Sequence, residues 1–363
     1  MSLQFITGAC GSGKSTYLCR SICQEAKKHI DKNYIILVPD QFTLETQKNM
    51  VEFSGGQGIL NIDVLSFHRL AYRVLEEMPV HRRTVLEDMG KMMLLRKVFA
   101  EEKKNLVYFK RGLNKPGFLD ECKSFFCELM QYAITEEDFS DLFGQFEKES
   151  LMSYKMQDLQ LIYRRFMEKM GDSYMMAEEL IPQLTALVPQ VGFLKDAVIC
   201  LDGFTGFTPV QNRLIGELLK VCDKIMLTVE IDRREDPFVY KHPYQLFALS
   251  KQMVTSLTEV AQEVRVEIDE PVWLCKNPSY RFKENPEMAF LEEELFRYSR
   301  RKYSGEKMRS ISLHEVHTPQ EEAQYVAEEI ARELGITTKT VEYHIRTALA
   351  ELRKIIAAII VFF

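Results

Sequence analysis

The sequence lacks several features that would point to a secreted or membrane protein. None of its eight cysteines forms a C-x-x-C pair, and the chain starts without the basic and apolar segments of a secretory signal. Its longest wholly apolar run is the nine residues 355–363, whereas a helix needs about 20 to cross a bilayer. We therefore expect a cytoplasmic protein with reduced cysteines and no membrane partner. Cys19 and Cys23 lie one helical turn apart, and we interpret them as helix packing because no second ligand pair is visible.

Positive charge is also not in excess. The 363 residues carry a formal net charge of −6, so no global basic field attracts nucleic acid. Any DNA-binding surface has to be a local groove. Of the residues, 46% are hydrophobic and 28% charged, enough apolar mass for two or three cores. The charge runs 292–294 and 300–302 are interpreted as solvated helix surface.

Residues 8–15 carry the motif G-x-x-x-x-G-K-[ST], between an apolar strand-like run and a helical pattern. In such a loop, backbone N–H groups converge on phosphate oxygens, and the helix N-terminus adds partial positive charge. Lys14 is expected to reach the β- and γ-phosphates, and the Ser15 hydroxyl to coordinate Mg²⁺. We therefore expect ATP and Mg²⁺ as cofactors, bound by Gly8, Ala9, Cys10, Gly11, Ser12, Gly13, Lys14 and Ser15.

An acidic partner for the Mg²⁺ should follow a buried strand elsewhere in the sheet. Asp202 fits, because it directly follows the apolar run 198–201. Helicase motors usually place a glutamate after this aspartate to polarise the attacking water. Here the next residue is Gly203, which has no side chain to act as a base. The residues thus favour ATP binding with little or no hydrolysis, and leave open whether the chain is an enzyme.

The order of strand-like and helical segments predicts an α/β fold: a parallel sheet covered by helices on both faces. The expected strands are 3–6, 34–38, 59–65, 197–202 and 224–231. We divide the chain into the first part of a P-loop lobe (1–83), a helical insertion (84–195), the remainder of the lobe with a mixed helical segment (196–308), the start of a truncated second lobe (309–334) and a helical tail (335–363). The second lobe is expected to begin with a strand at 310–316 and a helix at 319–334.

Three strings around these motifs, 38–43 (VPDQFT), 64–70 (VLSFHRL) and 201–211 (LDGFTGFTPVQ), resemble the AddB component of the bacterial AddAB helicase–nuclease. The resemblance runs from Met1 to about Leu334. It implies a RecA-like, superfamily-1-like fold and a role in double-strand break repair and homologous recombination, with an AddA-type partner subunit. It also implies a degenerate motor that holds and scans single-stranded DNA. Family members are much longer, and this chain ends before their nuclease domain and iron–sulfur ligands, so neither is expected here.

The expected DNA contacts lie on loops beside the phosphate site. Gln41 and Thr43 can hydrogen-bond base edges, and Arg69 can pair with phosphate or guanine. Aromatic side chains can stack on bases, and the candidates are Phe67, Tyr72 and Phe207. The alternative for each aromatic residue is packing in the core.

After about Leu334 the chain departs from that family, and residues 330–345 resemble the helix-turn-helix of extracytoplasmic-function sigma factors. Gly335 would lie in the turn and residues 338–353 would form the recognition helix. The helices that would complete such a domain are missing, which favours a fusion or truncation junction, or a terminal helix packed on the second lobe. Two functions therefore remain: an ATP-binding fragment that holds single-stranded DNA, and an ATP-sensing regulatory fusion that binds duplex DNA. A small-molecule kinase fits the long helical insertion poorly.

Overall fold

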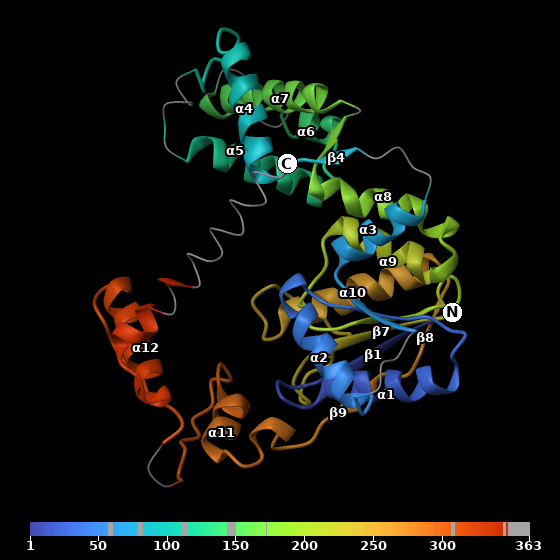
Figure 1. Ribbon diagram of the computed structural model, residues 1–363, viewed down its shortest axis with the longest axis vertical. Coiled ribbons are helices and arrows are strands. Elements are labelled where there is room, and N and C mark those ends of the chain that lie inside the picture. The colour runs from blue at the N-terminus through green and yellow to red at the C-terminus, as the bar shows by residue number, and fades with distance from the viewer. Residues whose placement is uncertain are drawn as a thin grey trace. The chain divides into compact units, whose positions relative to one another are not determined.

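The computed structural model describes residues 1–56, 61–78, 83–110, 115, 117–143, 150–171, 173–305, 309–343 and 346–347. The chain divides into two compact units (Figure 1). The first consists of Met1–Glu284 and Glu292–Ser299, and the second of Asn285–Leu291 and Arg300–Phe363. Within the described part of the chain, no helix combines the length and the apolar character that a membrane span requires.

A parallel sheet forms the centre of the first unit. Its strands are β1 (Ser2–Gly8), β2 (Tyr34–Leu37), β3 (Ile62–Leu65), β6 (Val198–Leu201), β7 (Lys224–Glu230), β8 (Glu267–Ile268) and β9 (Val272–Leu274). The order is β3-β2-β6-β7-β1-β8, and β9 also pairs with β1. Every pair in this sheet is parallel. The α/β, RecA-like class predicted from the sequence is confirmed.

Side chains of the central strands alternate between two hydrophobic layers, which explains their unbroken apolar runs. Ile35 and Leu37 of β2 pack on one face, while Tyr34 and Ile36 pack on the other. The helices on the first face are α3 (Phe67–Glu77), α8 (Leu180–Leu187), α9 (Pro209–Leu219) and α10 (Ala248–Glu263), and those on the second are α1 (Lys14–Lys28) and α2 (Thr43–Phe53). Figure 1 shows these two layers of helices on opposite sides of the strands.

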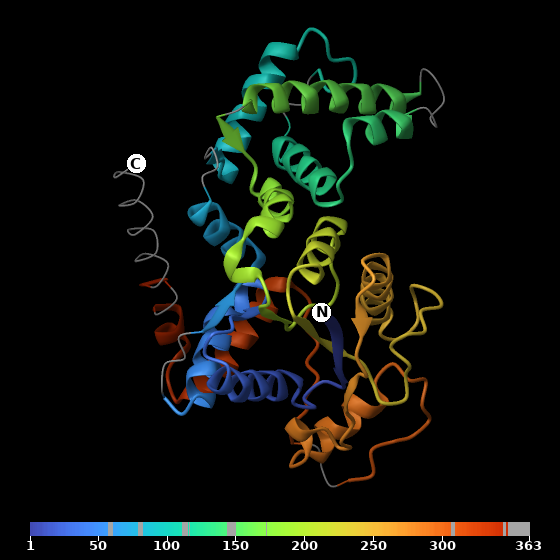
Figure 2. The same cartoon turned by 90° about the vertical axis from the view of Figure 1, so that its right-hand side faces the viewer.

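A separate block of helices lies between α3 and α8 in the sequence (Figure 1, Figure 2). It contains α4 (Asp88–Glu102), α5 (Phe118–Gln131), α6 (Glu136–Phe143) and α7 (Leu151–Met170) around its own apolar cluster, which includes Phe99, Phe126 and Phe166. Two short parallel strands, β4 (Thr84–Val85) and β5 (Tyr174–Met175), bring the two ends of the block together. Helix α8, which the sequence pattern assigned to the insertion, packs on α3 and α9 against the sheet.

The buried carboxylate of Asp158 organises one turn of this block. It accepts hydrogen bonds from the backbone N–H groups of Val107, Tyr108 and Phe109 at 2.8–3.1 Å. These donors follow α4 and lie outside any helix or strand, so the Asp158 side chain supplies the acceptor that their N–H groups need. Asp158 on α7 therefore fixes the chain segment that leaves α4.

The second unit corrects one prediction. The described residues 309–317 contain no strand, although 310–316 has strand-like alternation. The carboxylate of Glu287, at the start of α11 (Pro286–Glu294), accepts hydrogen bonds from the backbone N–H groups of Arg309 and Ser310 at 2.7–3.0 Å. These two donors, which a strand would give to a neighbouring strand, are thus used by a side chain.

Helix α12 (Pro319–Leu334) matches the predicted range 319–334. Thr318 caps its N-terminus by accepting from the Glu321 N–H, and Gly335 ends it in the left-handed conformation with φ 65°. Residues 338–343 are again helical. The rest of the predicted recognition helix, apart from 346–347, and the apolar run 355–363 lie outside the described residues.

Candidate nucleotide-binding site

The loop between β1 and α1 needs its glycines for identifiable reasons. Gly11 and Gly13 have φ angles of +70° and +90°, a region that side chains with a Cβ rarely adopt. A Cβ on Gly8 would lie 2.4 Å from Ser12 Oγ and 2.9 Å from the Leu274 carbonyl oxygen. Nothing lies within 4 Å of a Cβ placed on Gly13. The loop therefore has no room for a side chain at Gly8, whereas there is free space in front of the α1 N-terminus at Gly13.

Lys14, the first residue of α1, lies folded back across this loop. Its Nζ donates hydrogen bonds to the carbonyl oxygens of Gly8 and Ala9, each at 2.9 Å. Burial lowers the pKa of the Lys14 amine, an effect that the nearby Glu230 carboxylate partly opposes. The amine is therefore held at the loop as a poorly solvated hydrogen-bond donor. It could exchange its two carbonyl partners for the oxygens of a bound phosphate.

Asp202 and Ser15, 187 residues apart in the chain, meet beside this lysine. The Ser15 hydroxyl donates to Asp202 Oδ1 at 3.0 Å. Asp202 is buried at the end of β6, and Thr228 in β7 donates to the same Oδ1 at 2.6 Å. The predicted hydroxyl and carboxylate are thus brought together. Thr228 was not predicted, although it is a polar residue inside an otherwise apolar strand and that contrast is a signal in the sequence.

A cavity of about 720 Å³ opens over these groups. Its wall contains residues of the phosphate loop, Asp202, Thr228 and three further charged residues that sequence reasoning missed, Glu45, Glu230 and Arg281. Glu230 ends β7 and pairs in register with Gly8, so it places a second carboxylate beside the loop. The backbone N–H of Arg281 donates to the Gly11 carbonyl oxygen at 3.0 Å. Residues distant in the chain therefore complete the cavity.

These residues fit a nucleotide with Mg²⁺. The hydroxyl oxygen of Ser12 is buried without a hydrogen-bond partner among the described residues, which leaves a donor free inside the loop. Mg²⁺ at phosphates usually takes one or two protein ligands, with the remainder from phosphate and water. Ser15 and Asp202 are the pair that would hold it, and Gly8–Ser15 would hold the phosphates.

The predicted DNA-contacting residues fall into two groups. Gln41, Arg69 and Tyr72 are exposed and Phe207 is half-buried. Gln41 follows β2, Arg69 follows β3 and Phe207 follows β6. Gln41 lies in the short helical turn Asp40–Phe42, and Arg69 and Tyr72 lie in α3, so these three are on helical segments and not on loops as predicted. Because the strands are parallel, the segments that follow them begin at the carboxyl edge of the sheet, where open α/β sheets bind ligands.

Thr43 and Phe67 instead face the core, which corrects their assignment as DNA contacts. Thr43 is 4% exposed and donates its hydroxyl hydrogen to the Asp40 carbonyl oxygen. Phe67 is also 4% exposed and packs against Phe204 and Phe207, with ring centroids 5.4 and 6.2 Å away. The core-packing alternative therefore holds for Phe67.

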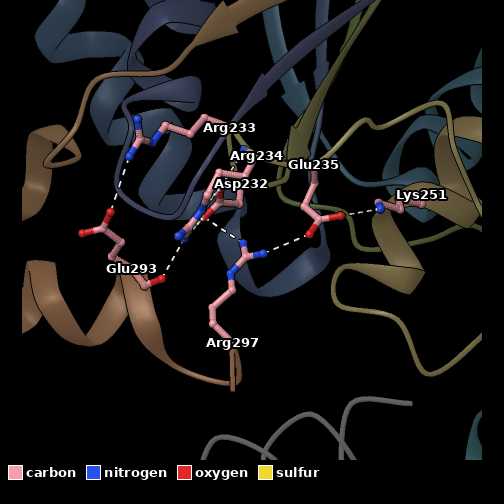
Figure 3. A network of polar contacts seen from close by, with 7 residues as sticks. All are labelled: Asp232, Arg233, Arg234, Glu235, Lys251, Glu293 and Arg297. Atoms are coloured by element: carbon pink, nitrogen blue, oxygen red, sulfur yellow. Dashed lines mark hydrogen bonds and ion pairs between the residues drawn. The ribbon is translucent and has the colours of Figure 1, made fainter. Parts of the chain in front are cut away.

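A network of charged residues fixes the segment that follows β7 (Figure 3). Asp232 is buried and accepts from the Arg234 guanidinium and backbone and from Arg297, at 2.8–2.9 Å. Arg297 also reaches Glu235, which pairs with Lys251 on α10 at 2.7 Å. Burial raises the pKa of Asp232, but the arginine hydrogen bonds and charges outweigh it and lower the value to about 2.

The chain is similar to one protein family and to several curated proteins. Residues 5–292 match the protein family described as "ADDB, N-terminal". Three curated relatives each carry the name of the B component of an ATP-dependent helicase/deoxyribonuclease. The protein of Lachnoclostridium phytofermentans is 36% identical over 335 residues, covering 92% of this chain and 29% of the relative. That of Clostridium perfringens (strain ATCC 13124) is 31% identical over 332 residues, covering 92% and 28%. That of Clostridium acetobutylicum is 32% identical over 298 residues, covering 82% and 25%.

The chain thus spans less than a third of the length of these relatives. The family match covers the phosphate loop, the helical block and Asp202 in one continuous range. On this extent of similarity, the chain belongs to the family of AddB N-terminal domains.

Proposed function

We propose that this chain binds ATP with Mg²⁺ and holds single-stranded DNA, as the N-terminal part of a helicase–nuclease subunit. In that role it would act with an AddA-type partner subunit in double-strand break repair and homologous recombination. The observation that carries the proposal is the contact between Ser15 and Asp202 at 3.0 Å, directly beside the loop-bound Lys14. This is the arrangement that a phosphate loop and its acidic partner need for a metal-bound nucleotide.

Each residue of the site has a separate role in binding. The loop N–H groups and the α1 N-terminus would donate to phosphate oxygens. Lys14 would supply the positive charge, and Thr228 holds Asp202 in place by its hydrogen bond. Bound Mg²⁺ would neutralise part of the phosphate charge.

The site is poorer in groups for hydrolysis than for binding. A general base must lie within reach of the attacking water, and Gly203, after Asp202, offers no side chain. The cavity wall has two other carboxylates, Glu45 on α2 and Glu230 at the end of β7, and Glu230 is the one that lies in register with Gly8 of the phosphate loop. We therefore propose binding with little or no hydrolysis, and Glu230 is the residue to which any remaining turnover would be assigned.

DNA would lie along the carboxyl edge of the sheet, across Gln41, Arg69 and Tyr72. Arg69 supplies a phosphate contact and Tyr72, 44% exposed, a stacking face. The net charge of −6 leaves only a local groove to neutralise phosphates, so binding should be weak, and its salt dependence should correspond to a small number of released counterions. The segment 202–207 would connect the two sites, since it begins at Asp202 beside the bound ATP and ends at Phe207 near the proposed DNA surface.

Calorimetry with ATP and Mg²⁺ tests the central claim. The wild-type chain should bind, Lys14→Ala should bind at least tenfold more weakly, and Asp202→Asn should reduce the Mg²⁺ dependence of binding. Lys28→Ala, on the exposed part of the same helix, is the matched control and should bind like wild type. Equal affinity of wild type and Lys14→Ala would overturn the proposal.

A second candidate function is the ATP-sensing regulatory fusion that reads duplex DNA. It is favoured by the α12–Gly335–helix arrangement, in which the left-handed Gly335 separates two helical segments. Gel-shift experiments on single-stranded and duplex probes separate the two functions. Deletion of residues 335–363 should leave single-stranded binding intact under the first proposal and abolish duplex binding under the second.

A further inference from the structure

A second cavity, of about 500 Å³, lies on the other side of the phosphate loop. We call it the aromatic cavity, because its wall contains the rings of Tyr17, Trp273 and Tyr280. It shares Gly13, Thr16 and Tyr280 with the larger cavity over Lys14. The two cavities therefore meet at the N-terminus of α1, where the phosphates would be held.

The position of Asp202 sets the direction in which a nucleotide would lie. Asp202 and its partner Thr228 come from β6 and β7, on one side of β1 in the sheet. Ser15 and Asp202 would hold a bound Mg²⁺ here, so the end of the phosphate chain that carries the metal would lie on this side. The nucleoside must then extend toward the opposite side of β1, which is formed by β9. The aromatic cavity contains Trp273 and Leu274 of β9.

The walls of the aromatic cavity match a purine base. Tyr17, Trp273 and Tyr280 remain 40%, 44% and 64% exposed, although such rings are usually well buried. Flat exposed rings at a cavity offer stacking surfaces for a flat base. Ser21 and Gln24 on α1 add hydroxyl and amide groups to the same wall, which can donate to and accept from the edge of the base.

The aromatic cavity is also firmly attached to the phosphate loop. The Thr7 hydroxyl donates to the Val272 carbonyl oxygen at 3.2 Å, and the Arg281 N–H donates to the Gly11 carbonyl oxygen at 3.0 Å. These bonds flank Trp273 and Tyr280 on either side. The backbone next to the two rings is therefore held relative to the loop before a ligand arrives, which lowers the entropic cost of binding.

We infer that the base of a purine nucleotide binds in the aromatic cavity, stacked on Trp273, with Tyr17 and Tyr280 beside it. This inference rests on the proposed binding of ATP at Gly8–Ser15 and assigns the part of the site that recognises the base. Phosphate contacts would then hold any nucleoside triphosphate, and the aromatic cavity would add affinity for purines over pyrimidines, because the larger purine ring covers more of the indole.

Trp273 is the only tryptophan of the 363 residues, so intrinsic tryptophan fluorescence reports on this cavity alone. Titration of the full chain with ATP and Mg²⁺ should change the fluorescence, and GTP should do so as well. CTP should give a smaller change at the same saturation of the site, measured by calorimetry. Inorganic tripolyphosphate with Mg²⁺ should bind without the change.

Trp273→Ala should weaken ATP binding by roughly tenfold, the equivalent of one stacking contact, and leave tripolyphosphate affinity unchanged. Trp273→Phe should keep most of the ATP affinity. Tyr132→Ala, an exposed aromatic residue on the helical block, is the matched control and should bind ATP like wild type. Unchanged tripolyphosphate affinity also shows that the variants are folded.

Two outcomes would overturn the inference, and they can be told apart. Failure of wild type to bind ATP and tripolyphosphate would overturn it together with the proposed function. Lys14-dependent ATP binding that is unaffected by Trp273→Ala, or a fluorescence change equally large with tripolyphosphate, would overturn the base assignment alone.

Discussion

Asp232→Asn should destabilise the fold in a way that depends on pH. The substitution keeps the shape of the side chain but removes the charge that holds Arg234 and Arg297. The pKa of Asp232 is lowered from 3.8 to about 2 in the folded protein, which corresponds to about 2 kcal/mol of stability at neutral pH. Arg234 is partly solvated, so screening reduces this, and we expect a loss of about 1–2 kcal/mol at pH 7.

The sign of the pH dependence follows from the direction of the shift. Because the folded-state pKa is lower than the unfolded-state pKa, the stabilisation is present above pH 4 and is lost as the pH falls toward 2. The difference in unfolding free energy between wild type and Asp232→Asn should therefore be constant from pH 7 to about 5 and fall to roughly half near pH 3.

Urea unfolding followed by circular dichroism measures this difference, since urea does not screen charge. Asp31→Asn, at an exposed position between α1 and β2, serves as the control and should cost less than about 0.5 kcal/mol. Equal stability of wild type and Asp232→Asn at pH 7 would refute the reasoning. A difference that stays constant down to pH 3 would show that packing, and not the Asp232 charge, stabilises the segment.

Three further predictions concern turnover, DNA and the helical block. ATP hydrolysis should be far slower than the roughly 10 s⁻¹ of a typical enzyme, and Glu230→Gln should reduce what remains; a DNA-stimulated rate of tens per second would contradict the proposed role of Gly203. Arg69→Ala should weaken binding of single-stranded DNA in gel shifts, uniformly across sequences if it contacts phosphate, while Arg164→Ala on the exposed face of α7 should not. Asp158→Ala should cost about 2–4 kcal/mol in urea unfolding, because three backbone donors lose their acceptor; a loss no larger than that of Asp31→Ala would show that water replaces the carboxylate.

The phosphate loop and Asp202 were predictable from sequence because the residues that identify them lie close together in the chain. The glycines, Lys14 and Ser15 are adjacent in the chain, and Asp202 directly follows an apolar strand. Glu230 and Arg281 were not predictable in the same way. Their place beside the loop depends on strand order and on a loop after β9, and neither is a property of the local sequence.

The burial of Thr43 and Phe67 could have been predicted. Phe67 shares a helix face with Leu70, Ala71 and Val74, all buried, at the spacing typical of a helix stripe that faces a core. Thr43 likewise begins α2 on the face of Thr46 and Met50. In contrast, the alternation of apolar and polar residues at 310–316 led to a wrong prediction of a strand. A strand needs a neighbouring strand to pair with, and the local sequence does not show whether one is present.

The insertion between β3 and β6 has a consequence for how the chain is made. Strand β2 pairs with β6 through Tyr34–Val198 to Leu37–Leu201, so its partner leaves the ribosome about 160 residues later, or roughly 8–30 s at usual elongation rates. During that interval the backbone N–H and C=O groups on this edge of β2 have no partner strand. An unpaired edge of an apolar strand is a template for pairing with another chain. The helical block has its own apolar cluster and can condense first. Nascent chains arrested after residue 190 should therefore be bound by chaperones at the segment 34–38, and chains arrested well beyond residue 231 should be released.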